Sequence, residues 1–149
     1  MTLDNEKKIV REPMPYGRVL VVDDTDAHLD VAKMLLRLYG LKIHTVKSAY
    51  EAIEKIQAGN EYDIVFMDHL MPKMDGIEAT KIIRGLGYRH PIIALTADDP
   101  QVYAEMFLAN GFDDFISKPI DLRQLDASLN KLIRDKHKGS AGQGSGGFS

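Results

Sequence analysis

Short apolar runs alternate with stretches of helical periodicity along most of the chain. Apolar residues at successive positions are typical of strands that are buried on both faces of a sheet. Strands are predicted near residues 19–22, 41–46, 64–67, 92–95 and 115–116. After each strand, apolar residues recur at helical spacing, and a glycine follows most of these helical stretches. The pattern therefore predicts five strand–helix units.

Repetition of strand–helix units determines the fold class. It produces a parallel sheet with helices on both faces. We predict a single α/β domain with a five-stranded parallel sheet of flavodoxin-like order 2-1-3-4-5, an order taken from known folds because the sequence does not specify it. The domain is predicted over residues 18–136, after a leader or interdomain linker over 1–17 and before a flexible Gly/Ser-rich tail over 137–149.

Composition narrows the classes of function. The formal net charge is −3 and no cluster of Lys and Arg stands out, which argues against direct nucleic-acid binding. The chain has no cysteine, so disulfides, thiolate metal sites and cysteine nucleophiles are excluded, and a reducing compartment is favoured. The longest apolar runs have the length of strands rather than of membrane spans. We therefore expect a cytoplasmic domain without membrane contact.

Polar residues of complementary chemistry stand where the predicted strands end. They are Asp23 and Asp24 after the first strand, Asp68 after the third, Thr96 after the fourth and Lys118 after the fifth. Ligands of open α/β sheets bind beyond the carboxyl ends of the strands, where these residues should converge. Three carboxylates in one place repel one another unless a cation joins them. Mg²⁺ is commonly held by one or two carboxylates together with a phosphate, so the pattern predicts a Mg²⁺ site.

The same residues are suited to phosphoryl transfer. One carboxylate can act as a nucleophile and form an acyl phosphate, and we assign this role to Asp68. Lys118 would supply positive charge to the phosphoryl oxygens, and the hydroxyl of Thr96 could donate a hydrogen bond to one of them. Each residue alone would more often be a turn residue, a helix cap or a solvated side chain. Their common position at successive strand ends favours a functional site.

The chain resembles the receiver domain of two-component signalling, the response-regulator family, from about residue 18 to about residue 133. The motifs that carry the resemblance are VLVVDD at 19–24, DHLMPKMDG at 68–76, ALTA at 94–97 and FISKP at 115–119. The resemblance implies that Asp68 is the site of phosphorylation. It also implies that Asp24, Asp68 and the backbone carbonyl of Leu70 ligate Mg²⁺, with Asp23 assisting through water.

Further implications of the resemblance concern how phosphate is held and what it changes. Lys118 and Thr96 would hold the phosphoryl group, Thr96 would move towards it, and Phe115 would turn inward. These motions would alter the face formed by the fourth helix, fifth strand and fifth helix, and a phosphorylation-dependent dimer is conceivable. Many family members carry tyrosine where this chain has Phe115, so partner contacts that need a hydroxyl are not expected. Leu70 and Asp98 occupy positions that tune phosphate lifetime in the family.

The sequence is most similar to receivers of hybrid sensor histidine kinases, notably in MDH at 67–69, MDGIEA at 74–79 and the stretch 106–115. Such a receiver exchanges phosphate with a histidine kinase or a histidine phosphotransfer domain. The resemblance implies that this chain catalyses only its own phosphorylation and dephosphorylation, while the parent protein could be a histidine kinase. A stand-alone single-domain response regulator is the alternative within the family.

Two other functions compete with this interpretation. A haloacid-dehalogenase-type phosphatase would use Asp24 and Asp26, but His28 stands where that family has threonine or valine, and Asp68 would have no role. A pseudo-receiver would bind proteins without being phosphorylated, and the retention of every site residue argues against it. His69 follows the nucleophile, but neighbouring side chains of an extended segment point to opposite sides, so we expect no catalytic role for it.

Overall fold

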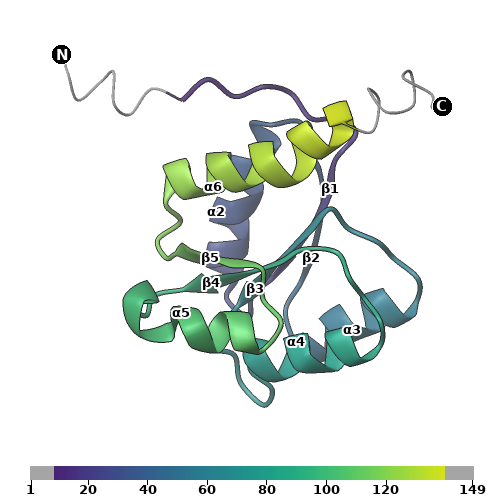
Figure 1. Ribbon diagram of the computed structural model, residues 1–149, viewed down its shortest axis with the longest axis vertical. Coiled ribbons are helices and arrows are strands. Elements are labelled where there is room, and N and C mark those ends of the chain that lie inside the picture. The colour runs from purple at the N-terminus through teal and green to yellow at the C-terminus, as the bar shows by residue number, and fades with distance from the viewer. Residues whose placement is uncertain (1–8, 140–149) are drawn as a thin grey trace.

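A computed structural model of the protein describes residues 9–139, which form a parallel sheet covered by helices. The sheet has five strands in the order β2-β1-β3-β4-β5 (Figure 1). The strands are β1 (Arg18–Val22), β2 (Lys42–Val46), β3 (Ile64–Asp68), β4 (Ile92–Thr96) and β5 (Asp114–Ser117). Every neighbouring pair is parallel. The predicted α/β class and strand order 2-1-3-4-5 are confirmed.

Helices cover both faces of the sheet. They are α2 (Asp26–Arg37), α3 (Ala49–Gln57), α4 (Gly76–Gly85), α5 (Pro100–Ala109) and α6 (Leu122–Leu129), and α6 continues into a short π-helical segment, η1 (Asn130–Arg134). Figure 1 shows α2 and α6 on one side of the sheet and α3, α4 and α5 on the other. Between residues 9 and 139, no helix has the length and hydrophobicity needed to cross a membrane.

The central strands contribute side chains to two hydrophobic cores, one on each face of the sheet. In β1, Leu20 and Val22 pack on the side of α3 and α4, whereas Val19 and Val21 pack on the side of α2 and α6. Every residue of β3 and β4 is buried, because helices cover both of their faces. The edge strand β2 is only partly buried, and its sequence, KIHTV, is correspondingly mixed.

The loop after β3 is held close to the sheet, next to Asp68. Asp75 caps α4, and its side chain accepts a hydrogen bond from the amide of Glu78 at 2.8 Å. A Cβ atom on Gly76 would collide with the backbone carbonyl of Asp68, so only glycine fits at this close approach. The amide of Gly76 also donates to the carbonyl of His69 at 2.9 Å. These contacts fix the backbone on both sides of the strand end.

The segment before β1 packs against the body of the domain. Met14 is fully buried, and its amide donates a hydrogen bond to the carbonyl of Tyr39 at 2.7 Å. Glu12 forms an ion pair with Arg134 at 3.0 Å, which joins this segment to η1. Part of the predicted leader therefore contacts both the α2 side of the core and the end of the last helix.

The predicted division into leader, domain and tail remains a prediction. Residues 1–8 of the leader and 140–149 of the tail lie outside the described residues. Residues 135–139 are helical and continue the direction of η1 beyond the predicted end of the domain at residue 136. Described structure thus continues beyond residues 18–136 at both ends, with buried Met14 before the domain and exposed helical residues after it.

Candidate phosphoryl-transfer site

Three carboxylates meet at the carboxyl ends of β1 and β3. Asp23 and Asp24 directly follow β1, and Asp68 is the last residue of β3. One oxygen from each carboxylate lies within 4.8 Å of the other two. The parallel register explains this, because Val22 and Met67 lie opposite each other and the acids follow next. We call this group the acid cluster.

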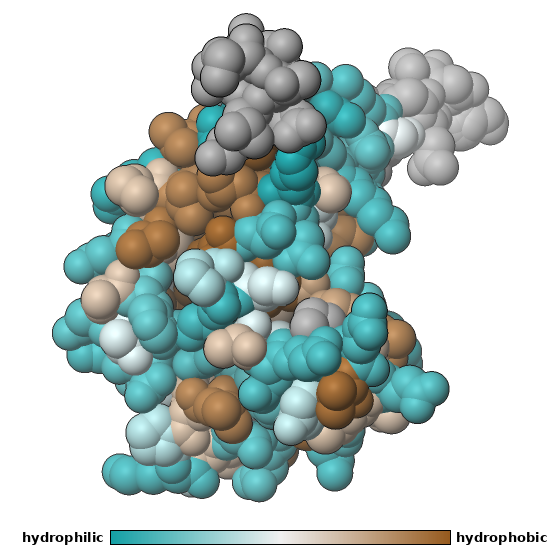
Figure 2. Space-filling model, turned by 90° about the vertical axis from the view of Figure 1, so that its left-hand side faces the viewer, coloured by the Kyte–Doolittle hydropathy of each residue, from teal (hydrophilic) through white to brown (hydrophobic). Residues whose placement is uncertain are grey.

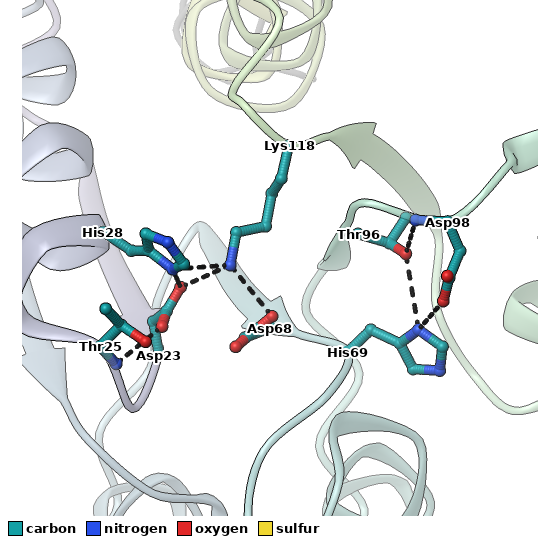
Figure 3. Close-up of polar contacts among 8 residues, drawn as sticks. All are labelled: Asp23, Thr25, His28, Asp68, His69, Thr96, Asp98 and Lys118. Carbon is teal, nitrogen blue, oxygen red and sulfur yellow. Dashed lines mark hydrogen bonds and ion pairs between the residues drawn. The ribbon is translucent and has the colours of Figure 1, made fainter.

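Lys118, which follows β5, reaches into the acid cluster (Figure 3). Its Nζ donates to Asp23 Oδ2 at 2.9 Å and to Asp68 Oδ1 at 3.2 Å. The lysine side chain is only 15% exposed, and the side chains of Asp23 and Asp68 are more deeply buried. One ammonium thus faces three carboxylates, and their mutual repulsion is only partly neutralised.

The electrostatics of Asp68 favour the binding of a cation. Burial, and next the negative charge of Asp23, raise the pKa of the Asp68 carboxyl from its ordinary 3.8 to about 6. The ammonium of Lys118 lowers the same pKa and offsets part of the rise. A carboxylate whose charge is costly in this way is stabilised by a bound metal ion. The ligand atoms are carboxylate oxygens, which suit Mg²⁺ and similar hard cations.

The acid cluster lies in a cleft of about 610 Å³ that opens at the carboxyl edge of the sheet. Val31 of α2 and Leu70 of the loop after β3 also line the cleft, and the side chain of Leu70 is 66% exposed. Figure 2 shows this face of the molecule, with a brown apolar area over α2 beside hydrophilic surface. The role of the Leu70 carbonyl as a metal ligand remains a prediction.

His28 is a member of this site that the sequence pattern did not reveal. It lies near the start of α2, four residues after Asp24. Its Nδ1 is 3.0 Å from Lys118 Nζ and 3.2 Å from Asp23 Oδ2. The three donors of the ammonium can therefore serve His28, Asp23 and Asp68 together. In the sequence, His28 is marked only by its position about one helical turn after Asp24. Such a spacing is too common to assign a role.

Thr96 ends β4 in the wall of the cleft, but its hydroxyl is directed towards His69 and Asp98 (Figure 3). The hydroxyl accepts a hydrogen bond from the amide of Asp98 at 3.0 Å and lies 3.5 Å from Nδ1 of His69. The same nitrogen is 3.1 Å from Asp98 Oδ2. The structure thus places Thr96 beside the acid cluster with its hydroxyl bonded elsewhere. His69 points away from the cluster, as the alternation of side chains predicts.

Phe115 lies in β5 and packs against the core on the side of α5. Its ring centroid is 6.2 Å from that of Phe107. The ring of Phe107 is in turn edge-on to His69, with centroids 5.0 Å apart. Aromatic contacts therefore extend from β5 to the loop after β3. The inward turn of Phe115 on phosphorylation remains a prediction.

The fold and this site define the class of protein, because a sheet of this order with acids and a lysine at its strand ends is the architecture of a receiver domain. The family model of the response regulator receiver domain matches residues 19–130, and the chain belongs to this family. The resemblance inferred from the sequence is confirmed. The chain is accordingly a receiver domain of the two-component phosphorelay type.

Two relatives show the settings in which similar receivers occur. The chain is 32% identical over 149 residues to Probable histidine kinase 6 of Oryza sativa subsp. japonica, covering 87% of this chain and 15% of that protein. It is 37% identical over 118 residues to the two-component response regulator ORR41 of the same organism, covering 77% of this chain and 93% of that protein. The chain therefore spans a small part of the kinase and most of the regulator.

Two solved structures agree with the fold. The receiver domain of the sensor histidine kinase PA1611 from Pseudomonas aeruginosa, with a magnesium ion coordinated in its active-site cleft, has a TM-score of 0.70 and 33% identity, covering 78% of this chain and 97% of that one. The second is the co-crystal structure of the Saccharomyces cerevisiae histidine phosphotransfer protein Ypd1 with the receiver domain of Ssk1. It has a TM-score of 0.73 and 25% identity, covering 87% of this chain and 94% of that one.

Proposed function

We propose that Asp68 accepts a phosphoryl group from a phosphohistidine of a partner protein in a Mg²⁺-dependent reaction. The observation that carries the proposal is the position of Asp68 in an open cleft, 3.2 Å from Lys118 and within the acid cluster. Asp23 is less suited to be the nucleophile, because its carboxylate also accepts a hydrogen bond from the amide of Thr25 and contacts His28. Among residues 9–139, only Lys118 donates a hydrogen bond to the carboxylate of Asp68.

The proposed reaction exchanges one bond to phosphorus for another. A carboxylate oxygen of Asp68 forms the new O–P bond while the N–P bond of the donor histidine breaks and the imidazole leaves. Lys118 offsets the charge of the phosphoryl oxygens, and Thr96 donates to one of them after moving. Mg²⁺, held by Asp24, Asp68 and the carbonyl of Leu70 with Asp23 assisting, would add positive charge at the same oxygens. Attack of water on the acyl phosphate returns the carboxylate.

The partner is proposed to be a histidine kinase or a histidine phosphotransfer domain. The surface beside the cleft supports a protein partner, because Val31 and Met34 of α2 are exposed and Leu70 projects at the mouth of the cleft. The brown area over α2 in Figure 2 lies beside this reactive edge. Exposed apolar patches of this kind mark protein interaction sites. The Ssk1 receiver, solved with the phosphotransfer protein Ypd1, supports the same class of partner here.

We further propose that the domain is a module of a cytoplasmic hybrid histidine kinase. The match to a short part of a histidine kinase supports this origin, while the match to most of a response regulator keeps the stand-alone regulator as the alternative. In either setting, phosphorylation is proposed to move Thr96 and Phe115. This would alter the face formed by α5, β5 and α6, through which a phosphorylation-dependent dimer could form.

The geometry gives no support to a haloacid-dehalogenase-type phosphatase. Asp26, the second acid of that motif, is exposed, and its carboxylate pairs with Lys47 at 2.9 Å. It therefore lies outside the acid cluster, which is formed by Asp23, Asp24 and Asp68. A phosphatase of that class would leave Asp68 unused, although Asp68 is the acid whose ionisation the site perturbs most clearly.

Incubation with acetyl phosphate and Mg²⁺ tests the proposed function. We expect intact-mass spectrometry to show a gain of about 80 Da, the mass of one phosphoryl group. A chelator should block the gain, and Asp68→Asn should remove it. Asp30→Asn is the matched control, because it makes the same change on the exposed side of α2, outside the acid cluster. No gain of mass in the unchanged protein would overturn the proposal.

A further inference from the structure

His69 is a buried side chain that the proposed reaction does not use. It directly follows Asp68, but it points to the opposite side of the strand and is only 6% exposed. Its backbone is fixed, because its amide donates to the carbonyl of Leu95 at 3.0 Å and its carbonyl accepts from Gly76 at 2.9 Å. The ring stands edge-on to Phe107 at 5.0 Å between centroids. His69 is therefore a rigid group packed against α5.

A single nitrogen of this ring joins the end of β3 to the loop after β4. His69 Nδ1 lies 3.1 Å from Asp98 Oδ2, a close polar contact between a ring nitrogen and a carboxylate. The amide of Asp98 donates to the hydroxyl of Thr96 at 3.0 Å. Asp98 thus contacts His69 with its side chain and Thr96 with its backbone. We call the contact between His69 Nδ1 and Asp98 Oδ2 the loop latch.

The loop latch acts on the position of Thr96. Its hydroxyl oxygen is directed towards Asp98 and His69, as Figure 3 shows, and both contacts lie on the side away from Asp68. To donate to a phosphoryl oxygen on Asp68, the hydroxyl has to turn from the side of His69 and Asp98 towards Asp68. Any contact that holds Asp98 in place therefore opposes that movement.

We propose that His69 is a positioning residue whose polar contact with Asp98 holds Thr96 away from Asp68 and so slows phosphorylation of this domain. This inference rests on the proposed phosphorylation of Asp68. The His69 end of the loop latch is rigid. The side chain of Asp98 is 35% exposed and can move away from His69 when the loop after β4 rearranges. The latch therefore sets how often the loop after β4 adopts the arrangement that supports a phosphoryl group.

Substitutions at the two ends of the latch separate its polar contact from simple packing. His69→Phe keeps a flat ring against Phe107 but removes the donor, and Asp98→Ala removes the acceptor at a partly exposed position. His69→Asn keeps a donor near the place of Nδ1 without the ring. His90→Phe is the matched control. It removes a histidine of the loop before β4, which lies 3.8 Å from Glu61 and far from the acid cluster.

The measurement is the rate of phosphorylation by acetyl phosphate and Mg²⁺, followed by intact mass. We expect His69→Phe and Asp98→Ala each to be phosphorylated about fivefold faster than the unchanged protein, a modest factor for the loss of one polar contact with a carboxylate. The double variant should be no faster than either single one, because both remove the same contact. His69→Asn and His90→Phe should keep the unchanged rate.

The two proposals fail on different results. If the unchanged protein takes up no phosphoryl group, the proposed function fails. If the unchanged protein is phosphorylated but His69→Phe and Asp98→Ala are equal to it or slower, only the latch is overturned. A rate for His69→Asn as high as that of His69→Phe would also overturn the latch, because the donor would then be irrelevant. Before phosphorylation, the methyl resonance of Thr96 in Asp98→Ala should shift towards its position in the phosphorylated unchanged protein, and an unmoved resonance contradicts the latch.

Discussion

Asp68→Asn should make the metal-free protein more stable at neutral pH, although it removes the proposed nucleophile. Burial and the charge of Asp23 raise the pKa of Asp68 from 3.8 to about 6, so the folded protein holds a proton that the unfolded chain has already released. Each unit of difference in pKa corresponds to about 1.4 kcal/mol, so ionised Asp68 costs the folded state about 3 kcal/mol. Asparagine has nearly the same shape and carries no charge.

The sign of the pH dependence follows from the two pKa values. Well below pH 3.8, Asp68 is protonated in the folded and unfolded states and its charge costs nothing. As the pH rises from 3.8 to about 6, the unfolded chain loses its proton first, and the stability of the unchanged protein falls. Above this range the full cost is present. The stability difference between Asp68→Asn and the unchanged protein should therefore widen by about 2 kcal/mol from about pH 4.5 to about pH 7.5.

Urea denaturation followed by circular dichroism, with a chelator present, would measure this difference at each pH. Asp30→Asn on the exposed side of α2 serves as the control, and its difference from the unchanged protein should vary little over the same range. Addition of Mg²⁺ should raise the stability of the unchanged protein and narrow the difference, because the ion binds the folded state. A difference for Asp68→Asn that is constant, or that narrows as the pH rises, would refute the reasoning.

Two further substitutions test packing outside the acid cluster. Arg84→Lys should lower the free energy of unfolding by about 2 kcal/mol, because Arg84 donates to three backbone carbonyls and pairs with Asp113, and an ammonium cannot reproduce this set. Unchanged stability in urea denaturation would contradict this role. Thr80→Val should raise the free energy of unfolding by about 1 kcal/mol, because the Thr80 hydroxyl is buried without a hydrogen-bond partner among the described residues. A lower melting temperature would argue against it.

The buried strands of the sheet could be predicted because burial on both faces requires an uninterrupted run of apolar residues. Residues 64–67 and 92–95 are apolar throughout, since helices cover both faces of β3 and β4. The strand order had to be taken from known folds, because repeated strand–helix units do not say which edge each new strand joins. Met14 could not be recognised as a core residue, because one apolar side chain in a charged, proline-containing segment carries no periodicity.

The acid cluster was predictable for a topological reason, since parallel strands bring their carboxyl ends to one edge. The contacts that join separate elements were not. His28 meets Lys118 across 90 positions of sequence, and the contact depends on how α2 packs beside the loop after β5. The direction of the Thr96 hydroxyl likewise depends on His69 and Asp98, which come from different loops. The spacing of these residues along the sequence indicates neither the contact of His28 with Lys118 nor the direction of the Thr96 hydroxyl.

The ion pair between Glu12 and Arg134 brings the incoming and outgoing stretches of the domain to the same place, near the amino ends of the strands. Asp68 lies at the other end of β3. Neighbouring domains joined at these two points would be attached at the amino ends of the strands, away from the cleft at the carboxyl ends. Such an attachment would leave the reactive edge of the module accessible to a partner.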